Sequence, residues 1–232
     1  NANKGKIHAG FSINQNWLHD WRQYVVIDDS NFQTAVNLWF SNQADANDTY
    51  GHISDWNTSA VTDMANAFNG RSNFNDDISR WDVSSVITMW GMFQGASSFD
   101  QDIGDWNVSS VSIMQHIFHS ATSFNQDVGD WNTSSLTTTH RAFHRAFAFD
   151  QDLSKWNTTS LTSMHQMFNV TNSLSNANKG KIHASFSSNQ NWPYASWSAH
   201  VVTLDTGLVA RYDFDGNQSE FTRDKTGNGR DG

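Results

Sequence analysis

A five-fold repeat with a fixed period of 25 residues constrains this chain more than any other feature. Its clearest mark is a row of tryptophans at that interval, Trp56, Trp81, Trp106, Trp131 and Trp156. The neighbouring residues recur with them, so that repeat two reads ISRWDVSSVITMWGMFQGASSFDQD and repeat three IGDWNVSSVSIMQHIFHSATSFNQD. Repeats of about 20–50 residues build solenoids, because each unit can bury its apolar side chains only against its neighbours. The sequence therefore predicts five stacked units rather than an irregular globule.

Two local patterns follow one another within a unit. The second half has apolar residues at the spacing of one helix face, in repeat two Val86, Met89, Phe93 and Ala96. Ser84 precedes them as a candidate helix N-cap. A short extended segment is expected around Ile78 and Trp81. Each unit is thus predicted to be a strand, a turn and a helix in an α/β solenoid, with the tryptophans in its core.

A longer repeat divides the chain. NANKGKIHAGFSINQNW at residues 1–17 returns as NANKGKIHASFSSNQNW at residues 176–192, an offset of seven 25-residue units. We therefore expect residues 1–30 to be the C-terminal tail of a preceding similar module and residues 31–52 to be an N-terminal cap. Residues 53–175 are expected to hold the five repeats, and residues 176–205 a C-terminal cap, because the end units of a solenoid need covering.

The repeated unit, W-[DN]-[VT]-S-S-V-T-x-M-x-x-M-F-x-x-A-x-x-F-[DN]-Q-D, resembles that of the BspA-like bacterial surface proteins, a divergent relative of the leucine-rich repeat. The resemblance covers residues 53–174, with Thr139 and Phe147 as the main departures. It implies a leucine-rich-repeat-like α/β solenoid of 25-residue strand–turn–helix units with helical caps. It also implies a large, non-enzymatic, secreted or surface-anchored protein used in adhesion. Residues 206–232 resemble the first strand of a laminin-G-like domain and are expected to be the truncated start of one.

Six residues are predicted to line a ligand-binding face: Asp55, Arg80, Trp90, Asp105, Asp130 and Lys155. Five of them share one position of the repeat, where the charge changes from unit to unit while the framework stays constant. A strand at that position would point these side chains away from the core, although a plain solvated surface explains them equally well. Trp90 replaces the polar Gln115 and His140 at a different position and is expected to be an exposed contact.

A second column consists of aspartates and is a candidate calcium site: Asp77, Asp102, Asp127 and Asp152. Each has an Asn or Asp two residues earlier, and Ca²⁺ binds six to eight oxygens. The alternative, which we favour, is that each carboxylate accepts hydrogen bonds from backbone N–H groups of its own turn.

Five histidines gather in the predicted helical halves of repeats three to five: His116, His119, His140, His144 and His165. The spacing of 25 residues predicts that His119 faces His144 and that His140 faces His165 across neighbouring units. Such a cluster can hold a transition metal. Because no carboxylate completes a metal site at suitable spacing, we favour a solvated helix surface.

Charge and composition narrow the function classes. The formal net charge of −9 argues against a nucleic-acid partner, and no apolar run approaches the ~20 residues of a membrane span. No nucleophile–base triad, phosphate loop or paired acidic site appears, so an enzyme is not expected. We expect an extracellular or cell-surface module that binds a protein or glycan ligand. The alternatives are a self-associating spacer or filament subunit, whose partners are identical modules, and ice binding by a row of hydroxyls, Ser59, Ser84, Ser109, Ser134 and Thr159.

Overall fold

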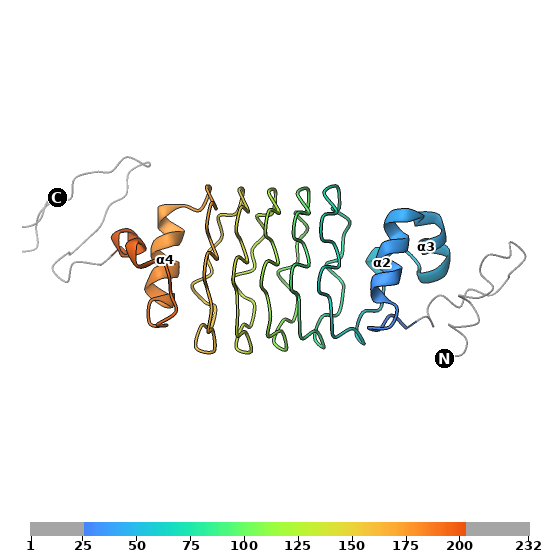
Figure 1. Ribbon diagram of the computed structural model, residues 1–232, viewed down its shortest axis with the longest axis horizontal. Coiled ribbons are helices and arrows are strands. Elements are labelled where there is room, and N and C mark those ends of the chain that lie inside the picture. Colours follow the sequence, from blue (N-terminus) through green and yellow to red (C-terminus); the bar gives the residue numbers. More distant parts are fainter. Residues whose placement is uncertain (1–25, 203–232) are drawn as a thin grey trace, which may run out of the picture. The chain divides into compact units, whose positions relative to one another are not determined.

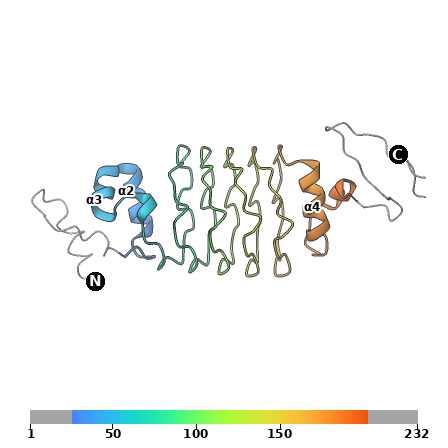
Figure 2. The same ribbon diagram turned by 180° about the vertical axis from the view of Figure 1, so that it is seen from behind.

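Five coils of chain follow one another between helical segments in the computed structural model, which describes residues 26–202 (Figure 1). Figure 2 shows the same coils side by side from behind. The described residues lie in the first of two compact units, Asn1–Val201, apart from Val202. The helices before the coils are α2 (Phe32–Ser41), α3 (Gln43–Tyr50) and the 3-10 helix η2 (Ile53–Asp55); those after them are α4 (Asn176–Phe186) and the 3-10 helix η3 (Ala195–His200).

The predicted leucine-rich-repeat-like α/β solenoid of strand–turn–helix units is wrong. Residues 26–202 contain no β-strand, and residues 56–175 contain no helix. Parallel pairing between coils is reduced to isolated bridges, Asp63–Thr88, Thr88–Ile113, Ile113–Thr138 and Thr138–Ser163. These bridges fall beside and within the segments predicted to be helical. The segment predicted to be a strand is a turn, in which the Trp81 N–H donates to the Ile78 carbonyl at 3.1 Å.

The helix is absent because its backbone donors are used between coils. We call the segment concerned the turn column, which consists of residues 64–70, 89–95, 114–120, 139–145 and 164–170. Alternate N–H groups donate to the next coil, as Met89 does to the Ile113 carbonyl and Phe93 to the Ile117 carbonyl, both at 2.9 Å. The groups between them close local turns, as Met92 does to Met89 at 3.2 Å. An α-helix would need these donors for carbonyls four residues earlier, so the two arrangements exclude each other.

Left-handed backbone at two positions in each of the five segments of the turn column also prevents a helix. These positions are four residues apart and have φ between 54° and 72°: Asn66, Gly70, Gly91, Gly95, His116, Ser120, Arg141, Arg145, Gln166 and Val170. A residue with a side chain is disfavoured there by about 1–2 kcal/mol. The hydrogen bonds between coils offset this cost, because they satisfy N–H groups that would otherwise have no partner.

The predicted tryptophan core is confirmed. The five indoles are 2–4% exposed, and in each of the last four coils the indole donates to a carbonyl 28 residues earlier, as Trp106 does to Ile78 at 3.2 Å. Two columns of phenylalanine lie within the same core, Phe68, Phe93, Phe118, Phe143 and Phe168, and Phe74, Phe99, Phe124 and Phe149. Ring centroids along the first column are 5.4–5.6 Å apart. One apolar interior therefore runs through all five coils.

Side chains replace the missing neighbour at both ends of the coils. The Asp29 carboxylate accepts the N–H groups of Thr62 and Asp63 at 2.7 and 3.0 Å, whereas residues at the position of Thr62 in the second to fifth coils donate to the preceding coil. The Tyr194 hydroxyl accepts the N–H of Phe168 at 2.8 Å. The first contact ends the hydrogen bonds at the position of Thr62, and the second satisfies one turn-column amide of the last coil.

Two predicted segments fall largely or wholly outside residues 26–202. They are the tail of a preceding module at residues 1–30, of which residues 26–30 are described, and the laminin-G-like strand at residues 206–232.

Substitution of Gly95 by alanine should lower the free energy of unfolding by about 1 kcal/mol. Gly95 has a φ of 70°, and an added Cβ would lie 3.6 Å from the nearest atom, an ordinary contact. The loss therefore comes from the backbone. Ser120→Ala is the matched control, because Ser120 already holds φ 60° with a side chain, and it should change stability by less than about 0.5 kcal/mol. Urea denaturation measures both, and equal losses would contradict this account of the turn column.

Trp106→Phe should destabilise the protein by about 2–4 kcal/mol. The change leaves the buried Ile78 carbonyl without its indole donor and opens a cavity in the core. Trp90→Phe, at a side chain that is 39% exposed, should alter the unfolding free energy by less than about 0.5 kcal/mol. Similar melting temperatures for the two variants would argue against a tryptophan-filled interior.

Candidate functional site

The predicted charge column is exposed in every coil and is partly neutralised within itself. Arg80 Nη2 lies 2.6 Å from Asp55 Oδ1, and Lys155 Nζ lies 2.5 Å from Asp130 Oδ1, each pair joining neighbouring coils. The hydrogen bond that Lys155 donates to Asp130 raises the pKa of Lys155. Ion pairs this exposed add little to stability. However, four of the five charged side chains proposed for ligand contact are already paired with one another.

The four aspartates of the predicted calcium column accept hydrogen bonds from their own turns, as in the alternative that we favoured. In each case Oδ1 accepts the backbone N–H two residues later at 2.9–3.0 Å: Ser79 to Asp77, Gly104 to Asp102, Gly129 to Asp127 and Ser154 to Asp152. The hydrogen bonds from Ser79 lower the pKa of Asp77. Among residues 26–202 no three His, Asp or Glu side chains are grouped so that they could hold a metal ion. The calcium hypothesis therefore has no support in the described part of the chain.

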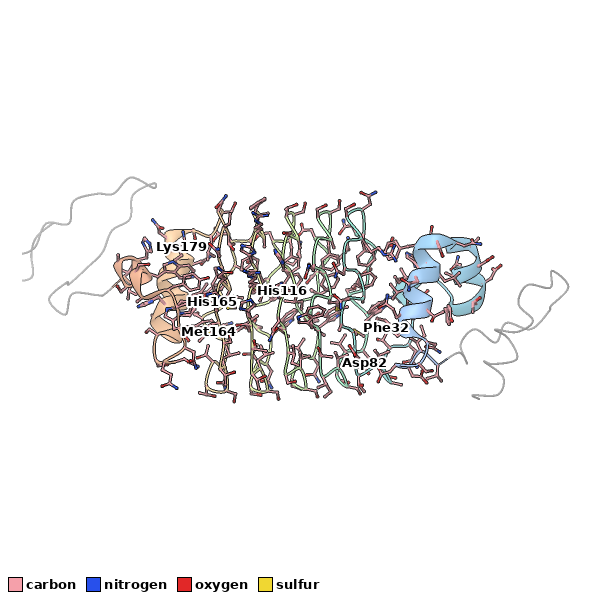
Figure 3. All side chains as sticks on the ribbon, in the orientation of Figure 1. Phe32, Asp82, His116, Met164, His165 and Lys179 are labelled. Carbon is pink, nitrogen blue, oxygen red and sulfur yellow. The ribbon has the colours of Figure 1, made fainter. Side chains whose placement is uncertain are left out.

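The five predicted histidines lie on the turn column rather than on a helix, and Figure 3 labels His116 and His165. The expected pairing across coils is confirmed, with ring centroids 4.8 Å apart for His119 and His144 and 5.4 Å apart for His140 and His165. His116 joins the two rows. Its Nδ1 lies 3.1 Å from His119 Nδ1, and its ring centroid 5.4 Å from that of His140.

Burial disfavours the charged form of four of these imidazoles. It lowers the pKa of His116 to about 4 and also lowers the pKa values of His119, His140 and His144. Neighbouring positive charges act in the same direction, and Arg141 contributes to all four shifts. In the described residues, no carboxylate is among the charged groups that shift these four histidines.

Arg141 and Arg145 complete the group, and the sequence analysis missed both. They occupy the same repeat positions as His116 and Ser120, one coil further on. The 25-residue spacing therefore could have predicted that they lie beside the histidines. Arg141 Nε donates to Gln166 Oε1 at 2.6 Å. We call the whole set the imidazole–guanidinium cluster: His116, His119, His140, Arg141, His144, Arg145 and His165.

Trp90 adjoins this cluster rather than the charge column with which it was grouped in the sequence analysis. Its ring centroid is 6.3 Å from that of His116, and the side chain is 39% exposed. The turn column therefore presents an exposed indole beside a group of imidazoles and guanidinium ions, on the outer side of an otherwise apolar segment.

Two hollows lie at the ends of the coils. One of about 500 Å³ is lined by residues of α2 and the first coil, where the Arg71 guanidinium lies 4.5 Å from the centre of the Phe40 ring and Trp39 Nε1 donates to Asp76 at 2.9 Å. The other, of about 440 Å³, is lined by residues 158–162 and 188–191. In the latter, Asn189 donates to the carbonyls of the last coil. These polar contacts hold the end segments to the coils.

A family model described as "Mycoplasma protein of unknown function, DUF285" matches residues 34–146 and 106–192, which together are more than half of the chain. Two overlapping matches are what a repeated unit produces, and they are compatible with the resemblance to BspA-like repeats. They give no support to a laminin-G-like domain. No curated protein and no solved structure matches the chain. Within residues 26–202, no helix has the length and apolar character needed to cross a membrane.

The melting temperature should fall as the pH is lowered from about 6.5 toward 4, and the fall should be smaller in His116→Asn. The folded state holds the pKa of His116 at about 4, below its ordinary value near 6.5. The unfolded chain thus binds more protons in this range, so acidification favours unfolding. Asn66 occupies the same position with φ 58° in the first coil, which makes asparagine compatible with the backbone. Ser120→Ala should keep the slope of the wild-type protein; an unchanged slope in His116→Asn would be inconsistent with a depressed pKa.

Proposed function

Because this chain belongs to the DUF285 family, a surface-associated repeat family of unknown function, we propose that it is a non-enzymatic extracellular module that binds a protein or glycan ligand. The binding surface is the outer side of the turn column, including Trp90 and the imidazole–guanidinium cluster. The ligand makes many shallow contacts along the coils, as repeat proteins with extended surfaces commonly do.

One observation carries this proposal: the outward positions of the turn column change chemical class from coil to coil, whereas its buried positions stay apolar apart from Thr139. The buried position of Phe68 is phenylalanine in all five coils, whereas the outward position that begins with Ala65 reads Ala, Trp, Gln, His and His. An apolar interior with a chemically variable exterior gives each coil a similar shape and a different surface. Tryptophan and arginine are also residue types that binding surfaces use for strong contacts.

The charge column is a weaker candidate for the same role. Two of its ion pairs already link adjacent coils, so a ligand that bound them would have to compete with existing partners. In the described part of the turn column, by contrast, no carboxylate is among the charged groups that shift the pKa values of its four histidines.

The alternatives are less favoured by the described residues. End-to-end self-association would use the faces of the first and last coils, but α2 packs its Phe40 on Phe74 and the segment after α4 packs Trp197 on Phe168. Ice binding would need a row of free hydroxyls, and those of Ser59, Ser84 and Thr159 donate to the side chain two residues earlier. Neither arrangement leaves the surface that the alternative requires.

A glycan and peptide array, read with two variants, tests the proposal. The triple variant W90Q/H140Q/H165Q gives its three positions the identity of Gln115, which the third coil already carries. It should lose at least about tenfold in affinity for the ligand that the wild-type protein selects, a difference of about 1.4 kcal/mol.

The control variant R80D/K155D places in the charge column the aspartate found there in the first, third and fourth coils, and it should bind as the wild-type protein does. The opposite ranking would assign binding to the charge column. An array without ligands, together with a molecular mass that rises with concentration in light scattering, would favour the self-associating spacer instead.

A further inference from the structure

The imidazole–guanidinium cluster concentrates cationic and titratable groups on a protein with a formal net charge of −9. The charged groups that act on its four shifted histidines are Arg141, Arg145 and other histidines of the cluster. A group of like charges without a counter-ion is unfavourable, so the neutral form of the shifted imidazoles is favoured in the free protein. An anionic partner would supply the counter-ion and favour the protonated form.

The cluster is also ordered along the coils. Its rings repeat from one coil to the next at 4.8–5.4 Å, in one row through His119 and His144 and in another through His116, His140 and His165. The hydrogen bonds between coils set this interval. Each row therefore has about one cationic or titratable side chain in each coil. A partner that fits it carries anionic groups at a similar interval.

An acidic polysaccharide fits this surface better than an acidic peptide does. A uronate chain carries one carboxylate on every sugar ring, so it can offer anionic groups to cationic positions in successive coils. Trp90 beside His116 adds an exposed aromatic face on which a sugar ring can stack, a contact that a peptide of acidic residues does not need.

Resting on the proposed function, we propose that the imidazole–guanidinium cluster binds a uronate-containing acidic polysaccharide along the coils, and that binding strengthens as the pH falls. Arg141 and Arg145 attract the carboxylates at any pH. The imidazoles become additional cationic donors once a carboxylate offsets their mutual repulsion and that of the two arginines. The histidines take up these protons from solvent.

The pKa values of the free protein set the sign of this dependence. Burial and the neighbouring charges hold those of His116, His119, His140 and His144 below the ordinary value. A bound carboxylate raises them, so the complex holds more protons than the free protein in mildly acidic solution. By linkage, lowering the pH then favours the complex, as long as the ligand stays ionised.

Calorimetric titration with a hexamer of 1,4-linked uronic acid tests this at about pH 7.5 and about pH 5, where carboxyl groups of ordinary pKa near 4 remain ionised. We expect at least about tenfold tighter binding at the lower pH, as the combined effect of raised pKa values in several histidines. The fully methyl-esterified hexamer, which has the same sugar rings without charge, should not bind. Titrations in two buffers with different heats of ionisation should show proton uptake, a readout that needs no variant.

Two variants separate the parts of the cluster, and the chain itself supplies the replacements. H116N/H119N/H144N uses the asparagines found at these positions as Asn66, Asn69 and Asn169, and should show a smaller change in affinity between the two pH values because only His140 of the four shifted histidines remains. R141Q/R145S uses Gln166 and Ser120 as its precedents and should weaken binding at both.

Several results would overturn the inference. They are binding of the neutral hexamer, equal binding of polyglutamate or single-stranded DNA, or affinity that does not change with pH while the array still selects a ligand. The last result would leave the proposed function standing. An empty array would remove both.

Discussion

A hydrogen bond from a backbone N–H to the carbonyl 24 residues later holds this structure together. It recurs at alternate residues of the turn column and replaces both the hydrogen bonds of a helix and the ladder of a sheet. Each such bond requires a neighbouring coil of the same shape, so no coil satisfies its backbone alone. The left-handed residues, the aromatic columns and the side chains that close the two ends all serve this one requirement.

The period and the interior could be predicted from the sequence, whereas the local backbone could not. The apolar spacing correctly indicated which side chains are buried, in repeat two Val86, Met89, Phe93 and Ala96. However, a series of consecutive short turns directs the same positions inward as a helix does. What distinguishes the two is the backbone at positions such as Gly91 and Gly95. Glycine at these positions indicates a left-handed backbone. The residues at the same positions of the next coil are His116 and Ser120, and these residue types alone do not predict that conformation.

The candidate site was found in part for a similar reason. Facing histidines followed from the register alone, because residues 25 apart meet whatever the local fold. The contribution of Arg141 and Arg145 depended on knowing that both outward positions of the turn column lie on one surface, which the predicted helix obscured. The charge column was identified correctly as exposed, yet its ion pairs depend on side-chain conformations that spacing does not specify.

The way in which the ends are closed has a consequence for how such proteins vary. Asp29 and Tyr194 accept three amides of the end coils through their own side chains, and neither contact depends on how many coils lie between them. Gain or loss of a whole 25-residue segment by recombination would leave both termini of the array intact. Length is therefore a heritable variable that selection can adjust independently of folding, and with it the reach of whatever the outer surface holds.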